Sequence, residues 1–331
     1  MSLKNLKKYG VRLANEFIEL PRFIPESYAL RYVTGGGFIL GGYYILTGDA
    51  GIGKTSICLK LMAERARDFN QSAIDAGVDP EEIEGYGLYI DNEGAVDSIL
   101  KGREDLFGLD PEKVYQTASP LSLEKTGDLI NECIRDPNCH TIILDSMKAS
   151  MPEKILDEKH SLEKDGMGAI GQSARTWNNI FGKWNSSRSS LEPKQRPLII
   201  LIDQLRVDVA GYYPMDKPTS GGRAALYNAH SYLKITKNKD TDYRYVQNIV
   251  KSRGAPANRK AEFGFEPIGG FDYSIELFEI AKESGALMQG GPFYSLEVDG
   301  EIIKLQGKNK VQERIVEDVK YKEALIKAIY G

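Results

Sequence analysis

The nine residues GDAGIGKTS, Gly48 to Ser56, have the types and the spacing of a phosphate-binding loop. They fit the Walker A pattern GxxxxGK[ST], with Gly48, Gly53, Lys54 and Thr55 in register. In such a loop, backbone N–H groups surround the phosphates, the lysine reaches the β and γ phosphates, and the hydroxyl ligates Mg²⁺. The pattern predicts a site for ATP and Mg²⁺ whose nucleotide contacts are Gly48, Asp49, Ala50, Gly51, Ile52, Gly53, Lys54, Thr55 and Ser56.

The segments on either side favour this interpretation over a glycine-rich turn that matches by chance. Tyr43 to Leu46 form a short apolar, β-prone run before the loop. After the loop, Thr55 to Ala66 carry Ile57, Cys58, Leu61 and Met62 at helical spacing. A helix that begins in the loop directs its first N–H groups towards a bound anion.

Three further polar side chains stand where predicted strands end. The strand TIILD ends in Asp145, whose carboxylate can join the Mg²⁺ shell, although it can also be a helix N-cap or a turn residue. The strand LYIDNEG ends near Glu93, a candidate base for the water that attacks a γ phosphate. Asp91 and Asp97 compete for that role, and a capping carboxylate is the alternative. We also count Asp97 among the candidate nucleotide contacts.

Gln204 follows the apolar strand LIILID and directly precedes a long polar segment. From there an amide can touch the γ phosphate and transmit its presence to that segment. An amide that satisfies backbone groups at the strand end is the alternative, and spacing alone does not separate the two.

The elements that must position these residues alternate between strands and helices. We expect strands at 43–47, 87–91, near Val114, at 141–145 and at 198–203, with helices at 54–68, 96–106, 122–135 and 167–184. This alternation predicts an α/β fold whose mostly parallel sheet is covered by helices on both faces. Ligands of such sheets bind beyond the carboxyl ends of the strands, where Glu93, Asp145 and Gln204 lie.

The remaining segments give the domain organisation. Residues 3–20 predict an amphipathic helix in an N-terminal arm, 1–30, ahead of an ATPase core, 31–269. Three β-prone runs at 230–237, 244–251 and 260–266 predict antiparallel additions to the sheet. A helix at 274–286, a hairpin about Asp299 and Gly300, and a helical end predict a small α+β C-terminal domain, 270–331.

Composition is that of an ordinary globular chain of 331 residues, with 41% apolar and 27% charged residues. There is no apolar run of about 18 residues, and the N-terminus lacks an apolar signal core, so we expect no membrane span and a cytoplasmic location. Cys58, Cys133 and Cys139 have no zinc-type spacing and are expected to be packing residues.

Positive charge is concentrated in one stretch of this acidic chain. Residues 217–260 contain ten Lys or Arg and two Asp, so this stretch carries +8 and the remainder −12 of a total of −4. A local basic surface indicates nucleic acid as a partner, and a solvated lysine-rich strand face is the alternative.

Taken in order, the motifs resemble the RecA family of recombinases, which includes the phage UvsX-like proteins. They are GDAGIGKTS, YIDNEGAVDS, IILDS, LIDQLR, TSGGRAALYNA, IVKSRGAP and FDYSIELFEIAKESGAL. The resemblance covers nearly the whole chain and implies a RecA-type phosphate-loop ATPase core. It also implies a DNA-dependent ATPase that forms helical filaments on single-stranded DNA and exchanges strands with a homologous duplex.

The resemblance assigns roles to individual residues. It makes Lys54 and Thr55 the phosphate and Mg²⁺ ligands, Asp145 the Walker-B acid, Glu93 the base and Gln204 the nucleotide sensor. In the family, Lys251 and Arg253 match paired cations that reach the γ phosphate of the neighbouring subunit, and membership of the general basic surface is the alternative.

Two segments match the DNA-binding loops of the family, Ser146 to Asp165 ending at Met167, and Leu205 to Ser220 followed by two glycines. An apolar side chain from each, Met167 and Val209, is expected to insert between bases. The other candidate DNA contacts are Arg175, Arg206, Tyr212, Tyr213, Gly221, Gly222 and Arg223.

Several positions depart from the family pattern. Asp203 replaces the usual Asn before the sensor, which puts a carboxylate near the γ phosphate and suggests weaker sensing or a compensating cation. Leu100 stands where an aromatic residue often stacks on adenine. The first loop carries Glu153, Asp157, Glu158, Glu163 and Asp165, so its DNA contacts are expected from Lys154, Lys159, Lys164 or backbone N–H groups.

Two alternative functions remain at this point. A ring-shaped helicase with a RecA core shares the loop and the acids, and a non-motor regulator binds nucleotide without turnover. Loader or single-strand-binding proteins are further possible partners of the recombinase.

Overall fold

The structure is a computed structural model of the chain. It describes residues 20–94, 107–156, 166–204, 220–239, 242–249, 258–266 and 270–331, and for 166–170 the backbone alone. The predicted helix at 96–106 and nearly all of the predicted helix at 3–20 lie outside these residues.

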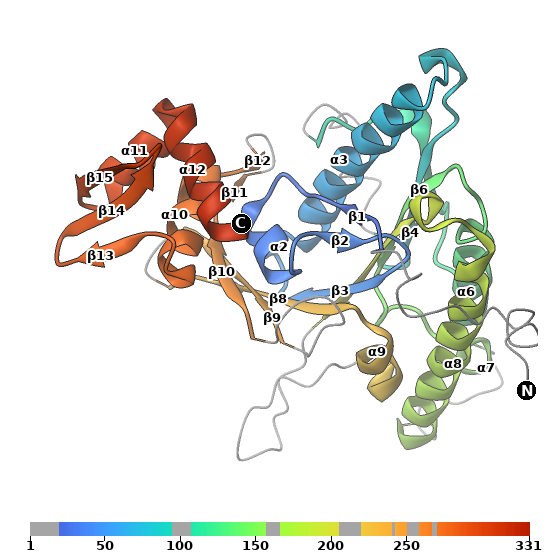
Figure 1. The fold of residues 1–331 in the computed structure, drawn as a ribbon. Coiled ribbons are helices and arrows are strands. Elements are labelled where there is room, and N and C mark those ends of the chain that lie inside the picture. Colours follow the sequence, from blue (N-terminus) through green and yellow to red (C-terminus); the bar gives the residue numbers. More distant parts are fainter. Residues whose placement is uncertain are drawn as a thin grey trace, which may run out of the picture.

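The core of the fold is an eight-stranded sheet (Figure 1). Its strands, in spatial order, are β10 (Lys260–Phe263), β9 (Arg244–Asn248), β8 (Ser231–Lys237), β3 (Tyr43–Gly48), β7 (Leu198–Gln204), β6 (Cys139–Asp145), β4 (Tyr86–Asp91) and β5 (Val114–Gln116). All neighbours from β8 to β5 are parallel. The expectation of a mostly parallel α/β sheet is confirmed.

One part of the strand prediction is wrong. We expected three antiparallel additions, but β8 pairs with β3 in parallel, with Leu46 opposite Leu233. Only β9 and β10 run antiparallel to their neighbours. The same β-prone, half-buried pattern suits both directions, so the direction depends on where the connecting chain re-enters the sheet.

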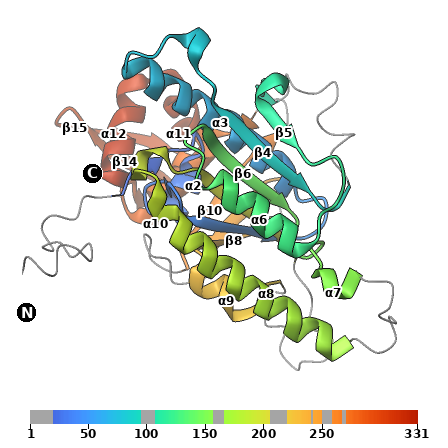
Figure 2. The same ribbon diagram turned by 90° about the vertical axis from the view of Figure 1, so that its right-hand side faces the viewer.

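Helices cover both faces of the sheet (Figures 1 and 2). On one face, α3 (Lys54–Asp75) and α2 (Tyr28–Val33) pack on side chains such as Leu46 and Ile200. On the other face, α6 (Leu123–Cys133), α8 (Gly166–Ser187) and α9 (Gly222–Asn228) cover Ile45 and Leu201. Successive residues of a strand point to opposite faces. Because helices cover both faces, the central strands are apolar along most of their length.

The C-terminal region has an apolar core of its own. Helix α10 (Tyr273–Ser284) is followed by an antiparallel sheet of β13 (Met288–Gly290), β14 (Phe293–Val298) and β15 (Glu301–Gln306), then by α11 (Lys308–Glu317) and α12 (Val319–Tyr330). Leu277, Leu296 and Tyr321 lie in this core. The predicted hairpin is present, with positive φ at Asp299 and Gly300, the conformation that a tight two-residue turn requires. Strand β13 was not predicted.

Smaller elements complete the fold. The pairs β1 (Arg22–Phe23) with β2 (Phe38–Ile39) and β11 (Phe265–Glu266) with β12 (Gly270–Phe271) are short antiparallel ribbons. Within the polar stretch after β6 lies α7 (Glu153–Leu156). Among the residues that the structure describes, none of the helices is long and apolar enough to cross a membrane.

The three cysteines are packing residues, as expected. Cys58, Cys133 and Cys139 are all buried and unbridged. Cys58 belongs to the core on the α3 face of the sheet, and the other two belong to the core on the α6 face.

Candidate nucleotide site

The loop of residues 48–53 lies between the end of β3 and the start of α3. Gly53, the second glycine of the pattern, and Gly51 within the loop have φ values of 98° and 73°, which L side chains rarely adopt, so the backbone favours glycine at both positions. The Lys54 ammonium donates to the carbonyl oxygens of Gly48 at 3.0 Å and Asp49 at 2.9 Å. The side chain therefore folds back over the loop.

The first residue after the lysine is tied to the end of β6. Thr55 Oγ1 donates to Asp145 Oδ2 at 2.7 Å, and the Tyr89 hydroxyl donates to the same oxygen at 2.7 Å. Burial raises the pKa of Asp145, and these two hydrogen bonds act in the opposite direction. Burial also lowers the pKa of Lys54, while the Asp145 and Glu93 carboxylates oppose that shift.

The strand register explains why residues distant in sequence meet here. Asp91 pairs with Asp145 across β4 and β6, and Gly48 pairs with Gln204 across β3 and β7. Backbone hydrogen bonds extend the ladder beyond the strands, from Asn92 N to Asp145 O at 2.7 Å and from Met147 N to Ile202 O at 2.8 Å. The carboxyl ends of four parallel strands thus form one edge.

Glu93 and Gln204 are in direct contact at this edge. Gln204 Nε2 donates to Glu93 Oε1 at 2.6 Å, and Ser146 Oγ donates to the same oxygen at 2.5 Å. Asp91 Oδ1 accepts from the backbone N–H groups of Glu93 and Gly94, at 3.1 and 2.7 Å. Asp91 therefore caps the turn that carries Glu93, which leaves Glu93 as the exposed carboxylate of the two.

Asp203 is fully buried, and its carboxylate is directed to the base of the segment that follows β7. Oδ1 accepts from Gln204 N at 3.0 Å. Oδ2 accepts from Ser220 N at 3.3 Å and from the Tyr232 hydroxyl at 3.2 Å. Burial and this carboxylate raise the pKa of Tyr232, which keeps the phenol a donor. The three donors thus satisfy the Asp203 carboxylate, which stands where the RecA family pattern has an Asn. Through this carboxylate, Gln204 is linked to Ser220 and Tyr232.

Two predicted DNA contacts lie on the neighbouring helices α8 and α9. Arg175 of α8 and Arg223 of α9 are both exposed, and the two helices pack together (Figure 2). Gly221 has a φ of 71°, and a Cβ added there would lie 2.9 Å from Ala225 Cβ and 3.2 Å from Met147 Cε, so the start of α9 favours glycine. Gly222 opens α9 instead of ending a loop.

The other predicted residues are not described. Asp97, Leu100, Arg206, Val209, Tyr212, Tyr213, Lys251 and Arg253 lie outside the described residues, and so does the side chain of Met167. The acids and lysines predicted at 157–165 also lie outside them.

Part of the basic stretch is used inside the fold. Arg244 donates to the carbonyl oxygens of Ile52 in the loop, at 2.8 Å, and of Phe265, at 3.0 Å. Arg259 donates to Tyr32 O at 3.1 Å, and Lys260 lies 3.6 Å from the Tyr245 ring centroid. All three cations contact groups of the protein itself. Composition alone does not distinguish such cations from cations on an exposed basic surface.

Three residues of the edge were missed by the sequence analysis. Tyr89 and Ser146 contact Asp145 and Glu93, and Lys148 Nζ donates to Gln204 Oε1 at 3.0 Å. Each of them lies within three residues of the end of β4 or β6, and this proximity is the only signal by which the sequence could have indicated them.

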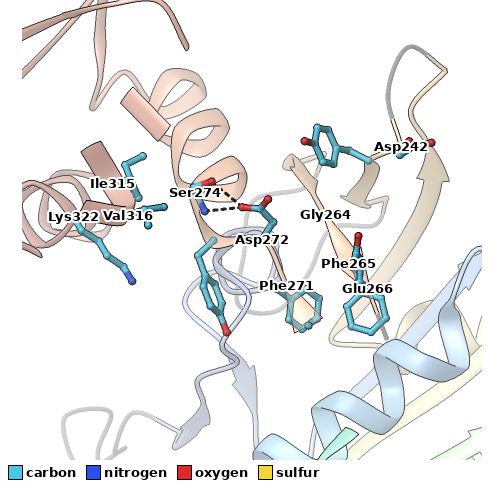
Figure 3. A pocket seen from close by; sticks show the side chains of 13 residues that line it. Asp242, Gly264, Phe265, Glu266, Phe271, Asp272, Ser274, Ile315, Val316 and Lys322 are labelled. Atoms are coloured by element: carbon cyan, nitrogen blue, oxygen red, sulfur yellow. Dashed lines mark hydrogen bonds between the residues drawn. The ribbon is translucent and has the colours of Figure 1, made fainter. Parts of the chain in front are cut away.

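A separate hollow of about 570 Å³ lies between the sheet and the C-terminal region (Figure 3). Its lining includes Phe265, Phe271, Asp272 and Val316, and none of the loop or edge residues described above belongs to it. Asp272 also caps α10 through Ser274 N and Oγ, at 3.1 and 2.8 Å. The hollow is thus distinct from the candidate nucleotide site.

The loop, the acidic and amide side chains at the sheet edge, and the strand order define an α/β protein with a RecA-type phosphate-loop core. The chain is similar to proteins named RecA over most of its length. It is 26% identical to that of Bacteroides thetaiotaomicron over 303 positions, covering 88% of this chain and 83% of the relative. The RecA proteins of Aquifex aeolicus, at 25% identity, and Chloroherpeton thalassium, at 26%, match 91% and 98% of this chain and 81% and 85% of their own. No protein-family model matches the chain. These similarities support the resemblance to the RecA family.

Proposed function

We propose that the protein is a RecA-family, DNA-dependent ATPase that forms filaments on single-stranded DNA and catalyses homologous pairing and strand exchange. The observation that carries the proposal is the convergence of Lys54, Thr55, Asp145, Glu93 and Gln204 at one edge of the parallel sheet. Two long segments leave the sheet from this same edge, after β6 and after β7. The similarity to proteins named RecA supports the finer assignment.

The donors and acceptors of the loop fit a nucleotide with Mg²⁺. The Lys54 ammonium rests on carbonyl oxygens, for which phosphate oxygens are charge-matched replacements. Thr55 Oγ1 and the Asp145 carboxylate are adjacent hard oxygen ligands, the kind that Mg²⁺ prefers. The bound ion would neutralise charge on the β and γ phosphate oxygens.

Glu93 is proposed as the group that accepts the proton of the attacking water. Its carboxylate is exposed at the edge and is held by the amide of Gln204. A γ phosphate would offer the same amide a second acceptor, so nucleotide state and the position of Gln204 would be linked.

DNA and a second subunit complete the proposal. The segments 146–165 and 205–220 would contact single-stranded DNA, with Arg175, Arg206 and Arg223 on its phosphates. Met167, Val209, Tyr212 and Tyr213 would insert or stack between bases, with Gly221 and Gly222 at the base of the second segment. Lys251 and Arg253 would act on the γ phosphate of the neighbouring subunit, and Asp97 on the nucleotide.

We also propose the division into an arm, 1–30, an ATPase core, 31–269, and a small C-terminal domain, 270–331. The separate apolar core around Leu277, Leu296 and Tyr321 supports the last boundary.

ATP hydrolysis with and without single-stranded DNA tests the function. Wild type should be stimulated by DNA, and Glu93→Gln should bind ATP normally but hydrolyse it at least about a hundredfold more slowly, because the base is lost. The matched control is Glu297→Gln, an exposed residue of β14, which should behave as wild type. Equal hydrolysis by Glu93→Gln and wild type would remove Glu93 from this role.

Strand exchange itself requires a joint-molecule assay with homologous and heterologous duplexes. Joint molecules with the homologous duplex alone support the recombinase. Closed rings in electron micrographs, with DNA-stimulated hydrolysis but without joint molecules, would favour a helicase, since a non-closing contact gives filaments and a closing one gives rings.

A further inference from the structure

Lys148 is a charged residue at the sheet edge that neither the phosphate-loop pattern nor the motif set contains. It lies three residues after Asp145, and its side chain is exposed. Its ammonium donates to Gln204 Oε1 at 3.0 Å, while Gln204 Nε2 donates to Glu93 Oε1 at 2.6 Å. The amide therefore lies between a cation and a carboxylate.

The chain after β6 is fixed in a way that brings Lys148 to this place. Met147 N donates to Ile202 O at 2.8 Å, and the Met147 side chain is buried at 1% exposure in the core beneath α8 and α9. Ser150 Oγ donates to Ser146 O at 3.1 Å and accepts from Asn92 Nδ2 at 2.7 Å. The residues on either side of Lys148 are therefore held by hydrogen bonds and by the burial of Met147. The Lys148 side chain points to the exposed edge, where it contacts Gln204.

Charge selects one of the two orientations of the Gln204 amide. In the observed orientation, the oxygen faces the ammonium and the NH₂ group faces the carboxylate. A rotation of the amide by half a turn would place the NH₂ group against Lys148, which has no acceptor, and the oxygen against Glu93, which has no proton when ionised. Without Lys148, one of the two contacts that favour the observed orientation is lost.

We infer that Lys148 is a positioning residue that holds the Gln204 amide in the orientation that presents Nε2 to Glu93. It thereby couples the first residues after β6 to the end of β7 at the candidate nucleotide site. The functional part of this inference rests on the proposed ATPase, whereas the contact itself does not.

The contact is tested by NMR on the full-length protein, without nucleotide or DNA. The Nε2 protons of Gln204 are identified by their loss in Gln204→Ala. Their exchange with water should accelerate about fivefold in Lys148→Met, as expected for the loss of one hydrogen bond of about 1 kcal/mol. Lys148→Arg should restore slow exchange, and Lys320→Met, an exposed lysine paired with Asp299, should leave it unchanged. Wild-type exchange in Lys148→Met would overturn the inference.

The functional arm measures ATP hydrolysis against DNA concentration. Lys148→Met should reduce the DNA-stimulated kcat about five- to tenfold at unchanged KM for ATP, and the double variant with Gln204→Ala should be no slower than Gln204→Ala alone, because both act through one contact. Lys148→Arg should recover most of the stimulation. Additive losses, or faster exchange with unchanged kcat, would overturn the positioning role. If wild type hydrolyses no ATP, the proposed function fails, while the exchange experiment still decides the contact.

Discussion

The hydroxyl of Thr55 and Asp145 Oδ2 are 2.7 Å apart and share a hydrogen bond, although 90 residues separate them in the chain. The bond joins the first turn of α3 to the end of β6. Because Tyr89 donates to the same carboxylate oxygen, the position of Asp145 is fixed from two elements. Any Mg²⁺ ion bound here would meet oxygens that are already in place, which lowers the cost of ordering the ligands.

The first prediction concerns Thr55. Thr55→Ala removes one oxygen ligand and should weaken ATP binding at least about tenfold in the presence of Mg²⁺, while Thr55→Ser should bind as wild type. The two variants should differ little when EDTA removes the ion. Titrations of a fluorescent ATP analogue with Mg²⁺ and with EDTA measure this. An equal loss in EDTA would show that the hydroxyl acts on folding of the loop and not through the ion.

The second prediction concerns the Asp203 network. Tyr232→Phe leaves a buried carboxylate oxygen with one donor fewer and should lower the free energy of unfolding by about 1–3 kcal/mol in urea. The control is Tyr321→Phe. The Tyr321 hydroxyl is buried without a hydrogen-bond partner within the described part of the chain, so its removal should cost little. Equal effects of the two substitutions would contradict the role of the Tyr232 contact.

Asp203→Asn provides a further test of the same network. The Asn side chain has a single acceptor atom in place of two, so it cannot serve Gln204 N on one oxygen and Ser220 N on the other. We expect destabilisation similar to that of Tyr232→Phe, and a double variant that loses less than the sum of the two. Full additivity in urea unfolding would show that the residues act separately.

The next prediction is a pH dependence from Glu276. This carboxyl is fully buried and accepts from Ser27 Oγ at 2.9 Å and Ala29 N at 3.2 Å, which joins α10 to the start of α2. Burial raises its pKa to about 8 from an ordinary 4.5, and Asp272 adds to this shift. The folded state therefore binds the proton more tightly than the unfolded state. The contribution of Glu276 to stability is complete below pH 4.5 and is lost as the pH rises through about 8.

Glu276→Gln imitates the protonated carboxyl at every pH. Relative to wild type, its free energy of unfolding should therefore rise with pH between 4.5 and 8, by up to about 1.4 kcal/mol per pH unit. Urea unfolding at three pH values in this window measures the difference, with Glu297→Gln as an exposed control. Parallel stability curves for Glu276→Gln and wild type would contradict the raised pKa.

The last prediction concerns the backbone of the loop. Gly53 has φ of 98°, and a Cβ added there meets nothing within 4 Å, so Gly53→Ala should destabilise through strain alone, by about 1–2 kcal/mol. Gly171 lies within α8, and an added Cβ also meets nothing within 4 Å. Gly171→Ala should stabilise by about 0.5–1 kcal/mol, because alanine is the better helix former. Thermal unfolding should therefore show a lower melting temperature for Gly53→Ala and a higher one for Gly171→Ala than for wild type. Shifts of the same sign would contradict the prediction.

Local patterns predicted much of this fold because they reflect local causes. Glycines at positions of positive φ, the lysine and hydroxyl after them, and apolar runs ending in Asp145 and Gln204 each follow from the needs of a few neighbouring residues. The parallel direction of β3, β4, β5, β6 and β7 was also predicted, but their spatial order was not, and the direction of β8 was predicted wrongly. The residue pattern of β8 does not specify which strand lies beside it or in which direction it runs. Both depend on the path of the chain that leads into β8.

The sequence by itself determined the phosphate loop, the alternation of strands and helices, and the carboxylates and amide that end three of the strands. Only the tertiary structure decided that Asp203 points to Ser220 and Tyr232, that Arg244 is bound to the loop backbone, and that Lys148 holds Gln204. The reason is physical: a carboxylate or ammonium has the same sequence signal whether it meets solvent, backbone or another side chain. Its partner is set by strand register across the sheet, which no local pattern contains.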